Sequence, residues 1–134
     1  MTKLVAIEPI LTLTTALFEA GREFEHSRLP ELYCGFPRQA RLGVTRYPVA
    51  CAPQAWAAGA LFQLLAACLD LTGEPLENRV TLVNPVLPPW LEWIEIHGLE
   101  VGRSSIDLRV VHGREAASVE LIGRRGDIEL VVRR

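Results

Sequence analysis

The residues best suited to chemistry lie in one long segment, residues 25–52, where a carboxylate stands among aromatic and basic side chains. Glu31 follows Pro30, whose ring stiffens the backbone just before the carboxylate. A carboxylate held rigidly beside an aromatic ring is suited to general acid or base chemistry on a sugar. The alternative is a structural ion pair with Arg28 or Arg38, because paired carboxylates are also common where no catalysis occurs.

Aromatic residues gather around the same segment. Tyr33, Phe36, Tyr47 and Trp56 could form a platform for sugar rings, since a sugar offers apolar faces for stacking and hydroxyl groups for hydrogen bonds. Trp56 also fits a buried core position, because the residues around it are almost wholly apolar. Both interpretations stay open at this point.

The cysteines and histidines do not form a recognisable metal or nucleophile pattern. There is no C-x-x-C pair, and the histidines share neither a helix face nor metal-ligand spacing, which predicts no metal site. Neither of the common glycine-rich nucleotide motifs occurs, so no cofactor is expected. An odd number of cysteines predicts no disulfide framework and a reducing cytoplasm. The residues concerned are Cys34, Cys51, Cys68, His26, His97 and His112.

Composition narrows the class of protein further. The chain has 134 residues, 49% of them apolar, and a formal net charge of −2. A chain of this length can bury a core without a metal or a disulfide, and its balance of charge disfavours a nucleic-acid partner. Glu8 and Pro9 interrupt the apolar N-terminal stretch, which argues against a signal peptide or a membrane span. We therefore expect one cytoplasmic domain covering residues 1–134.

Two helices must position the long segment. Apolar residues recur at three- and four-residue steps from Leu4 to Phe24, which predicts a helix over residues 8–23 with Pro9 in its first turn. A second helix is expected from Pro53 to Leu69, with Thr72 and Gly73 as its stop. The second helix is apolar nearly all round, so it should be covered on several sides. A connection as long as residues 25–52 without structure of its own is uncommon in a compact domain, which indicates a functional loop.

A change of period near Arg79 marks a second region. Apolar and polar residues alternate in five short runs after this point, with hairpin turns expected at residues 112–114 and 123–126. We predict an α+β fold, with a helical hairpin over residues 1–75 and a β tail over residues 76–134. The tail is expected to be one five-stranded, mostly antiparallel β-sheet.

Three segments carry a resemblance to a known family. They are RLPELYCGF at residues 28–36, YPVACAPQAWAAGA at residues 47–60 and LPPWL at residues 87–91. They resemble the C-terminal part of bacterial amylo-alpha-1,6-glucosidases, which are glycogen-debranching-like proteins, over about residues 17–108. The resemblance implies that the two helices are the last hairpin of a six-hairpin (α/α)6 toroid, a glycosidase architecture several times longer than this chain.

The resemblance also implies roles in the hydrolysis of a glycosidic bond. By its motif position Glu31 is similar to the general base of an inverting glycosidase, which acts with a general acid from the middle of the toroid. No segment of this chain matches that acid, and Asp70, Asp107 and Asp127 fall at a helix end and among the strands. The chain alone is therefore expected to be inactive. The substrate would be an α-glucan or oligosaccharide, and the candidate binding residues are Tyr33, Phe36, Arg38, Tyr47, Gln54 and Trp56.

Two other functional classes remain open. The chain could be a free-standing module that binds carbohydrate or another protein through its aromatic loop, or a scaffold kept for assembly. In each case the apolar helix at residues 53–70 needs a cover. We expect a homo-oligomer or a companion chain to supply it.

Overall fold

The computed structural model describes residues 4–37 and 43–134, and these fold into two compact units, Met1–Leu64 and Leu65–Arg134. The first unit contains α1 and most of the second helix, and the second unit contains the end of that helix and all the strands. The division falls inside the second helix instead of after residue 75, because the last turn of that helix packs with the strands.

Helix α1 spans Leu4–Gly21 and begins earlier than the sequence pattern indicates. Pro9 consequently lies in the helix interior instead of its first turn. The helix ends at Gly21, where a Cβ would lie 3.4 Å from both the Leu29 side chain and the Ser27 carbonyl oxygen. The short 3-10 helix η1, Glu25–Ser27, then reverses the chain direction.

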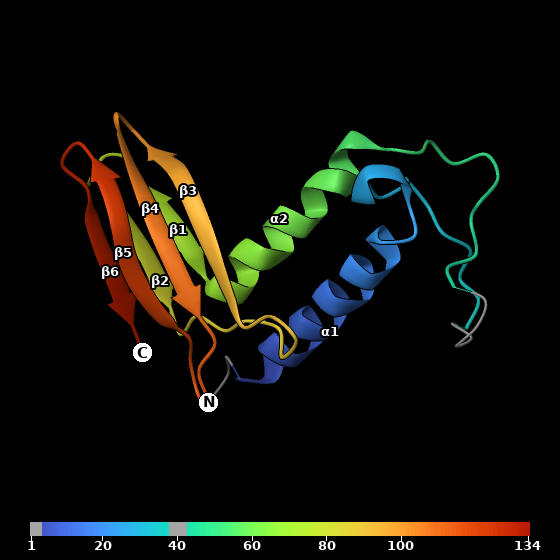
Figure 1. The fold of residues 1–134 in the computed structure, drawn as a ribbon, viewed down its shortest axis with the longest axis horizontal. Helices are drawn as coiled ribbons and strands as arrows, with labels where there is room; N and C mark the ends of the chain where they lie inside the picture. Colours follow the sequence, from blue (N-terminus) through green and yellow to red (C-terminus); the bar gives the residue numbers. More distant parts are fainter. Residues whose placement is uncertain (1–3, 38–42) are drawn as a thin grey trace. The chain divides into compact units, whose positions relative to one another are not determined.

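Helix α2 spans Ala55–Leu69. Pro53 was expected at its first position, but the helix begins two residues later, where the Ala55 backbone N–H donates a 3.1 Å hydrogen bond to Gln54 Oε1. The segment from η1 to α2 leaves the end of α1 and returns to the start of α2 (Figure 1).

The second unit contains two three-stranded sheets (Figure 1). In the first, β1 (Leu71–Glu74) pairs antiparallel with β2 (Arg79–Val83), and β2 pairs parallel with β6 (Glu129–Arg133). In the second, β3 (Trp93–Val101), β4 (Ser104–Val111) and β5 (Ser118–Arg125) form an antiparallel meander.

This arrangement differs from the single five-stranded sheet expected from the sequence. The five predicted runs all form strands, but β1 joins them as a sixth, in the Leu71–Glu74 segment where Thr72 and Gly73 suggested only a helix stop. The expected hairpin at residues 123–126 is also wrong, because β5 continues to Arg125 and β6 pairs with β2 in the other sheet.

One apolar core joins the two sheets and the last turn of α2. Along β4, Ile106, Leu108 and Val110 are fully buried and alternate with partly exposed residues, as a strand with one covered face requires. They pack with Val80 and Leu82 of β2. The other members of this core are Leu69, Leu87, Val101, Ala117 and Ile128.

Across the described residues, the helices are too short or too polar to cross a membrane.

Candidate functional site

The long segment between the helices folds back on itself, and its two sides, residues 29–36 and 43–54, lie against each other as the two plies of a strap. The Cys34 backbone N–H donates a 3.0 Å hydrogen bond to the Thr45 carbonyl, and Tyr33 forms an antiparallel bridge with Arg46. At the other end, the Gln54 N–H donates a 3.1 Å hydrogen bond to the carbonyl of the buried Leu29. The described parts of the segment are therefore held together by backbone pairing.

Glu31 occupies the middle of the strap. Its backbone N–H donates a 2.9 Å hydrogen bond to the Cys51 carbonyl. The Cys51 N–H points back to the Glu31 carboxylate, with 3.5 Å between the nitrogen and Oε2. Glu31 is half-buried and follows the buried Pro30. Cys51, on the opposite side of the strap, thus contacts both the backbone and the carboxylate of Glu31.

A second carboxylate, Glu23, ties the strap to the end of α1. Its Oε2 accepts a 2.8 Å hydrogen bond from the Val44 N–H, and its carbonyl accepts a 3.0 Å bond from Arg46 Nη2. The Arg46 guanidinium also lies over the Phe24 ring, with Cζ 4.5 Å from the centroid. Gly43 has a φ of +60°, and a Cβ there would collide with the Glu23 carboxylate.

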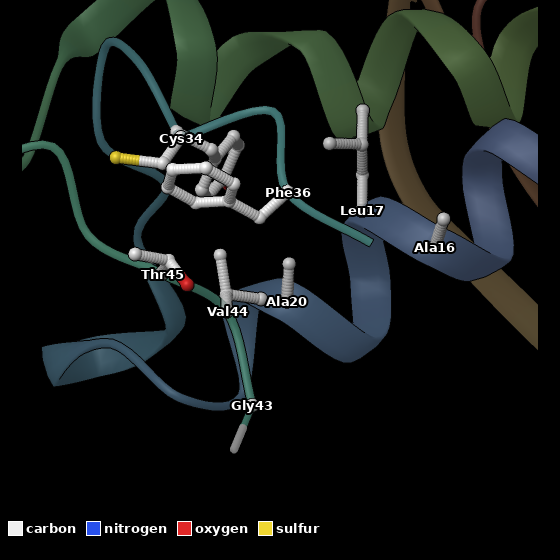
Figure 2. A pocket seen from close by; sticks show the side chains of 9 residues that line it. Ala16, Leu17, Ala20, Cys34, Phe36, Gly43, Val44 and Thr45 are labelled. Carbon is white, nitrogen blue, oxygen red and sulfur yellow. The ribbon is translucent and has the colours of Figure 1, made fainter. Parts of the chain in front are cut away.

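Next to these contacts of Glu23, the strap and α1 border an open hollow of about 180 Å³ (Figure 2). Its wall is mostly apolar, and Figure 2 shows the Val44 side chain next to Ala20 of α1, with the Phe36 ring extending toward Cys34. Polar groups come from Thr45 and from Cys34, whose Sγ donates to the Arg46 carbonyl at 3.5 Å. The remaining lining residues are Ala16, Leu17, Tyr33 and Gly43.

Tyr33, one of the lining residues, carries an unusual polar group. Its ring meets Phe24 edge to face at 5.9 Å, and its hydroxyl oxygen is buried without a hydrogen-bond partner among the residues that the structure describes. Burial raises the pKa of the Tyr33 phenol above its ordinary value of 10.0. A buried hydroxyl without a partner carries a free-energy cost.

The predicted site residues do not all gather here. Tyr33 and Phe36 line the hollow, whereas Glu31, Tyr47 and Trp56 do not. Tyr47 and Trp56 are 44% and 61% exposed, so the core interpretation of Trp56 does not fit this unit. Gln54 caps the start of α2 through its side chain. Arg38 lies outside the described residues.

Sequence reasoning missed Glu23, which organises this region together with Arg46. Its contacts reach 21 and 23 residues along the chain, so no local spacing could indicate them. The local signal in this region was Gly43, because a glycine in a turn can mark a place where two parts of the chain approach closely.

Among the described residues, no group of three His, Cys, Asp or Glu side chains could hold a metal ion. The three cysteines are free thiols. His97 Nε2 lies 2.9 Å from Glu95 Oε2 on β3, and His26 pairs with its neighbour Glu25 at 3.4 Å. These two histidines have local carboxylate partners.

The strap therefore offers a positioned carboxylate, and the hollow beside it offers aromatic rings with a few polar groups. Comparison of the chain with models of known families, with curated proteins and with solved structures found no match.

Proposed function

We propose that this chain is the C-terminal part of a glycogen-debranching-like α-glucosidase of the cytoplasm, in which Glu31 is the base that activates water. The observation that carries the proposal is the attachment of Glu31 to Cys51 through both its backbone and its carboxylate. A base must be held in place before the reaction if it is to act efficiently. The motifs around residues 28–36 and 47–60 supply both plies of the strap, so the resemblance and the geometry concern the same residues.

An inverting reaction also needs an acid, with the two carboxyl groups roughly 6.5–9.5 Å apart. The second unit contains Asp70, Asp107 and Asp127, and the Asp107 carboxylate already accepts a 2.6 Å hydrogen bond from the Gly98 N–H. We assign the acid to a segment other than this chain. The leaving group of a natural glucan would then depart unprotonated, so the chain alone has little or no activity on it.

The surface of α2 supports a place in a larger helical assembly. Trp56, Gly59 and Phe62 follow one another at three-residue steps and are exposed, Trp56 by 61% and Phe62 by 76%. A Cβ at Gly59 would have no heavy atom within 4 Å in the described structure, so nothing there requires a glycine. Glycine inside a helix costs about 0.5–1 kcal/mol relative to alanine, and close approach of another backbone would account for it. A second copy or a companion chain is the expected cover.

The first test measures glucose release from α-1,4 and α-1,6 glucans by the purified chain. We expect none, and turnover that disappears in Glu31→Gln would contradict the assignment of the acid to another chain.

A sharper test of Glu31 itself uses α-glucosyl fluoride, whose leaving group does not need an acid. Water attacks C1 as the C1–F bond breaks, Glu31 accepts the proton from water, and the products are β-glucose and fluoride. We expect fluoride release above the spontaneous rate, lost in Glu31→Gln and retained in the matched variant Glu25→Gln. A rate equal to the spontaneous one, or unchanged in Glu31→Gln, would exclude Glu31 as the base.

The hollow favours a second candidate, a module that binds carbohydrate without hydrolysing it. Tyr33 and Phe36 line the hollow, and the buried Tyr33 hydroxyl lacks a partner among the described residues. This candidate predicts glucan binding that weakens in Tyr33→Ala or Phe36→Ala while the fold is retained. Absence of binding at millimolar glucan would reject it.

A further inference from the structure

The outer face of the β3–β4–β5 sheet carries an aromatic ring among charged side chains. Trp93 of β3 is 48% exposed, and the Arg109 guanidinium of β4 lies over its ring, with Cζ 5.0 Å from the centroid. In the strand register Arg109 stands between Glu95 of β3 and Glu120 of β5. Since the neighbouring residues of β4, such as Leu108, are buried in the core, these four side chains belong to the opposite face.

Arg109 is positioned mainly by the indole. Its Nε is buried and has no hydrogen-bond partner within the described part of the chain. Glu95 Oε1 lies 3.9 Å from that nitrogen, beyond hydrogen-bond distance, while Glu95 Oε2 pairs with His97 Nε2 at 2.9 Å. The guanidinium is therefore held in place mainly by the ring.

The chemistry of this face selects a class of ligand. Two carboxylates flank one guanidinium, so the face does not attract a polyanion such as nucleic acid. The exposed part of an indole stacks on the apolar C–H face of a pyranose ring. Planar carboxylate and guanidinium groups at its edge can form paired hydrogen bonds with neighbouring hydroxyl groups. A neutral ligand with many hydroxyl groups fits this face. It carries no negative charge, it offers an apolar face to the indole, and it offers hydroxyl groups to the carboxylate and guanidinium groups.

We propose that Trp93, Arg109, Glu95 and Glu120 form a sugar-binding platform, separate from Glu31, that binds a neutral oligosaccharide. The platform lies wholly within the second unit. The choice of an α-glucan as its ligand rests on the proposed function, whereas the platform itself rests on the geometry of the sheet.

Tryptophan fluorescence provides a direct test, because the chain contains three tryptophans. The variant Trp56→Phe/Trp90→Phe keeps Trp93 as the only indole. We expect its emission to change in a saturable manner with millimolar maltoheptaose. Adding Arg109→Ala should weaken this binding about tenfold, as removal of a central contact typically does. Arg109→Lys, which keeps the charge but loses the planar fork, should also weaken it.

Control variants distinguish a loss of binding from a loss of the fold. Glu100→Gln changes an exposed residue of β3 whose partner is Arg125, 3.8 Å away, and it should leave binding unchanged. Circular dichroism of each variant checks the fold, and Trp93→Phe in the full chain replaces the indole by a smaller ring. No emission change with any oligosaccharide, or binding that persists fully in Arg109→Ala and Trp93→Phe, would overturn the platform.

The outcome is separable from that of the proposed function. Platform binding should be unchanged in Glu31→Gln, and fluoride release should be unchanged in Arg109→Ala. Binding of maltoheptaose without fluoride release supports the platform and counts against Glu31 as the base. Binding of cellohexaose but not maltoheptaose would support the platform and overturn its assignment to α-glucans.

Discussion

The Glu23 carboxylate accepts a 2.8 Å hydrogen bond from the backbone N–H of Val44, which joins the end of α1 to the far ply of the strap. The same residue's carbonyl accepts a bond from Arg46. We call these two contacts of Glu23 the clasp. Because Glu31 and the hollow belong to the strap, the clasp supports the candidate site.

We expect Glu23→Ala to loosen the strap more than it destabilises the chain. Loss of a charged hydrogen bond at an exposed position should cost about 1 kcal/mol of unfolding free energy. Hydrogen exchange should show the Val44 amide losing protection, and limited proteolysis should cleave the strap faster. Glu25→Ala is the control, because Glu25 pairs only with His26 among the described residues. Unchanged protection of Val44 would contradict the clasp.

Glu74 predicts a pH dependence of stability. Its Oε2 accepts hydrogen bonds from Arg79 Nε at 2.8 Å and Thr81 Oγ1 at 3.0 Å, and these hold the pKa of Glu74 below its ordinary value of 4.5. A depressed folded pKa stabilises the native state above the unfolded value, and the contribution is lost as pH falls through the folded value.

The corresponding measurement compares the unfolding free energies of the wild type and Glu74→Gln between neutral pH and about pH 3. The difference should be largest at neutral pH and shrink as the solution is acidified past 4.5. Glu77→Gln is a useful control, since Glu77 Oε2 is 3.9 Å from Arg79 Nη2. A difference that stays constant with pH would rule out this role for Glu74.

The buried Tyr33 hydroxyl should make Tyr33→Phe neutral or slightly stabilising, within about 1 kcal/mol, because the hydroxyl has no partner among the described residues. In Tyr47→Phe, Tyr33 is the only tyrosine left, and ultraviolet titration should show its pKa above 10.0. Because the folded pKa is raised, stability should fall as pH rises beyond the unfolded value, and Tyr33→Phe should remove this fall. Titration at the ordinary value would contradict the burial of this hydroxyl.

The exposed face of α2 predicts self-association of the chain. Replacing Trp56 or Phe62 by serine should shift the sedimentation coefficient toward that of a monomer, because it removes apolar area from the contact. Leu76→Ser is the matched control, since Leu76 is 98% exposed but lies in the turn between β1 and β2. A wild-type monomer at all concentrations would refute self-association and leave a companion chain as the cover of α2.

Several features of the fold follow from local pattern alone. The alternation through Ile106, Leu108 and Val110 correctly identified both a strand and its buried face, because side chains in a strand point to opposite sides in turn. The apolar run ending at Leu69 correctly identified α2. The sequence also drew attention to residues 25–52 as the long connection between the helices. Two of the aromatic residues singled out there, Tyr33 and Phe36, line the hollow.

Partner choice was decided only by the tertiary structure. Alternation says which face of a strand is buried but not which strand lies beside it, so the parallel pairing of β2 with β6 and the division into two sheets were not predictable. The same limit applies to the site. Its contacts join residues far apart in the chain and form only when the two sides of the strap pair during folding. They are Glu31 with Cys51, Glu23 with Val44 and Tyr33 with Arg46. The sequence by itself determined the residue types and the local elements, whereas long-range backbone pairing determined which of those residues meet.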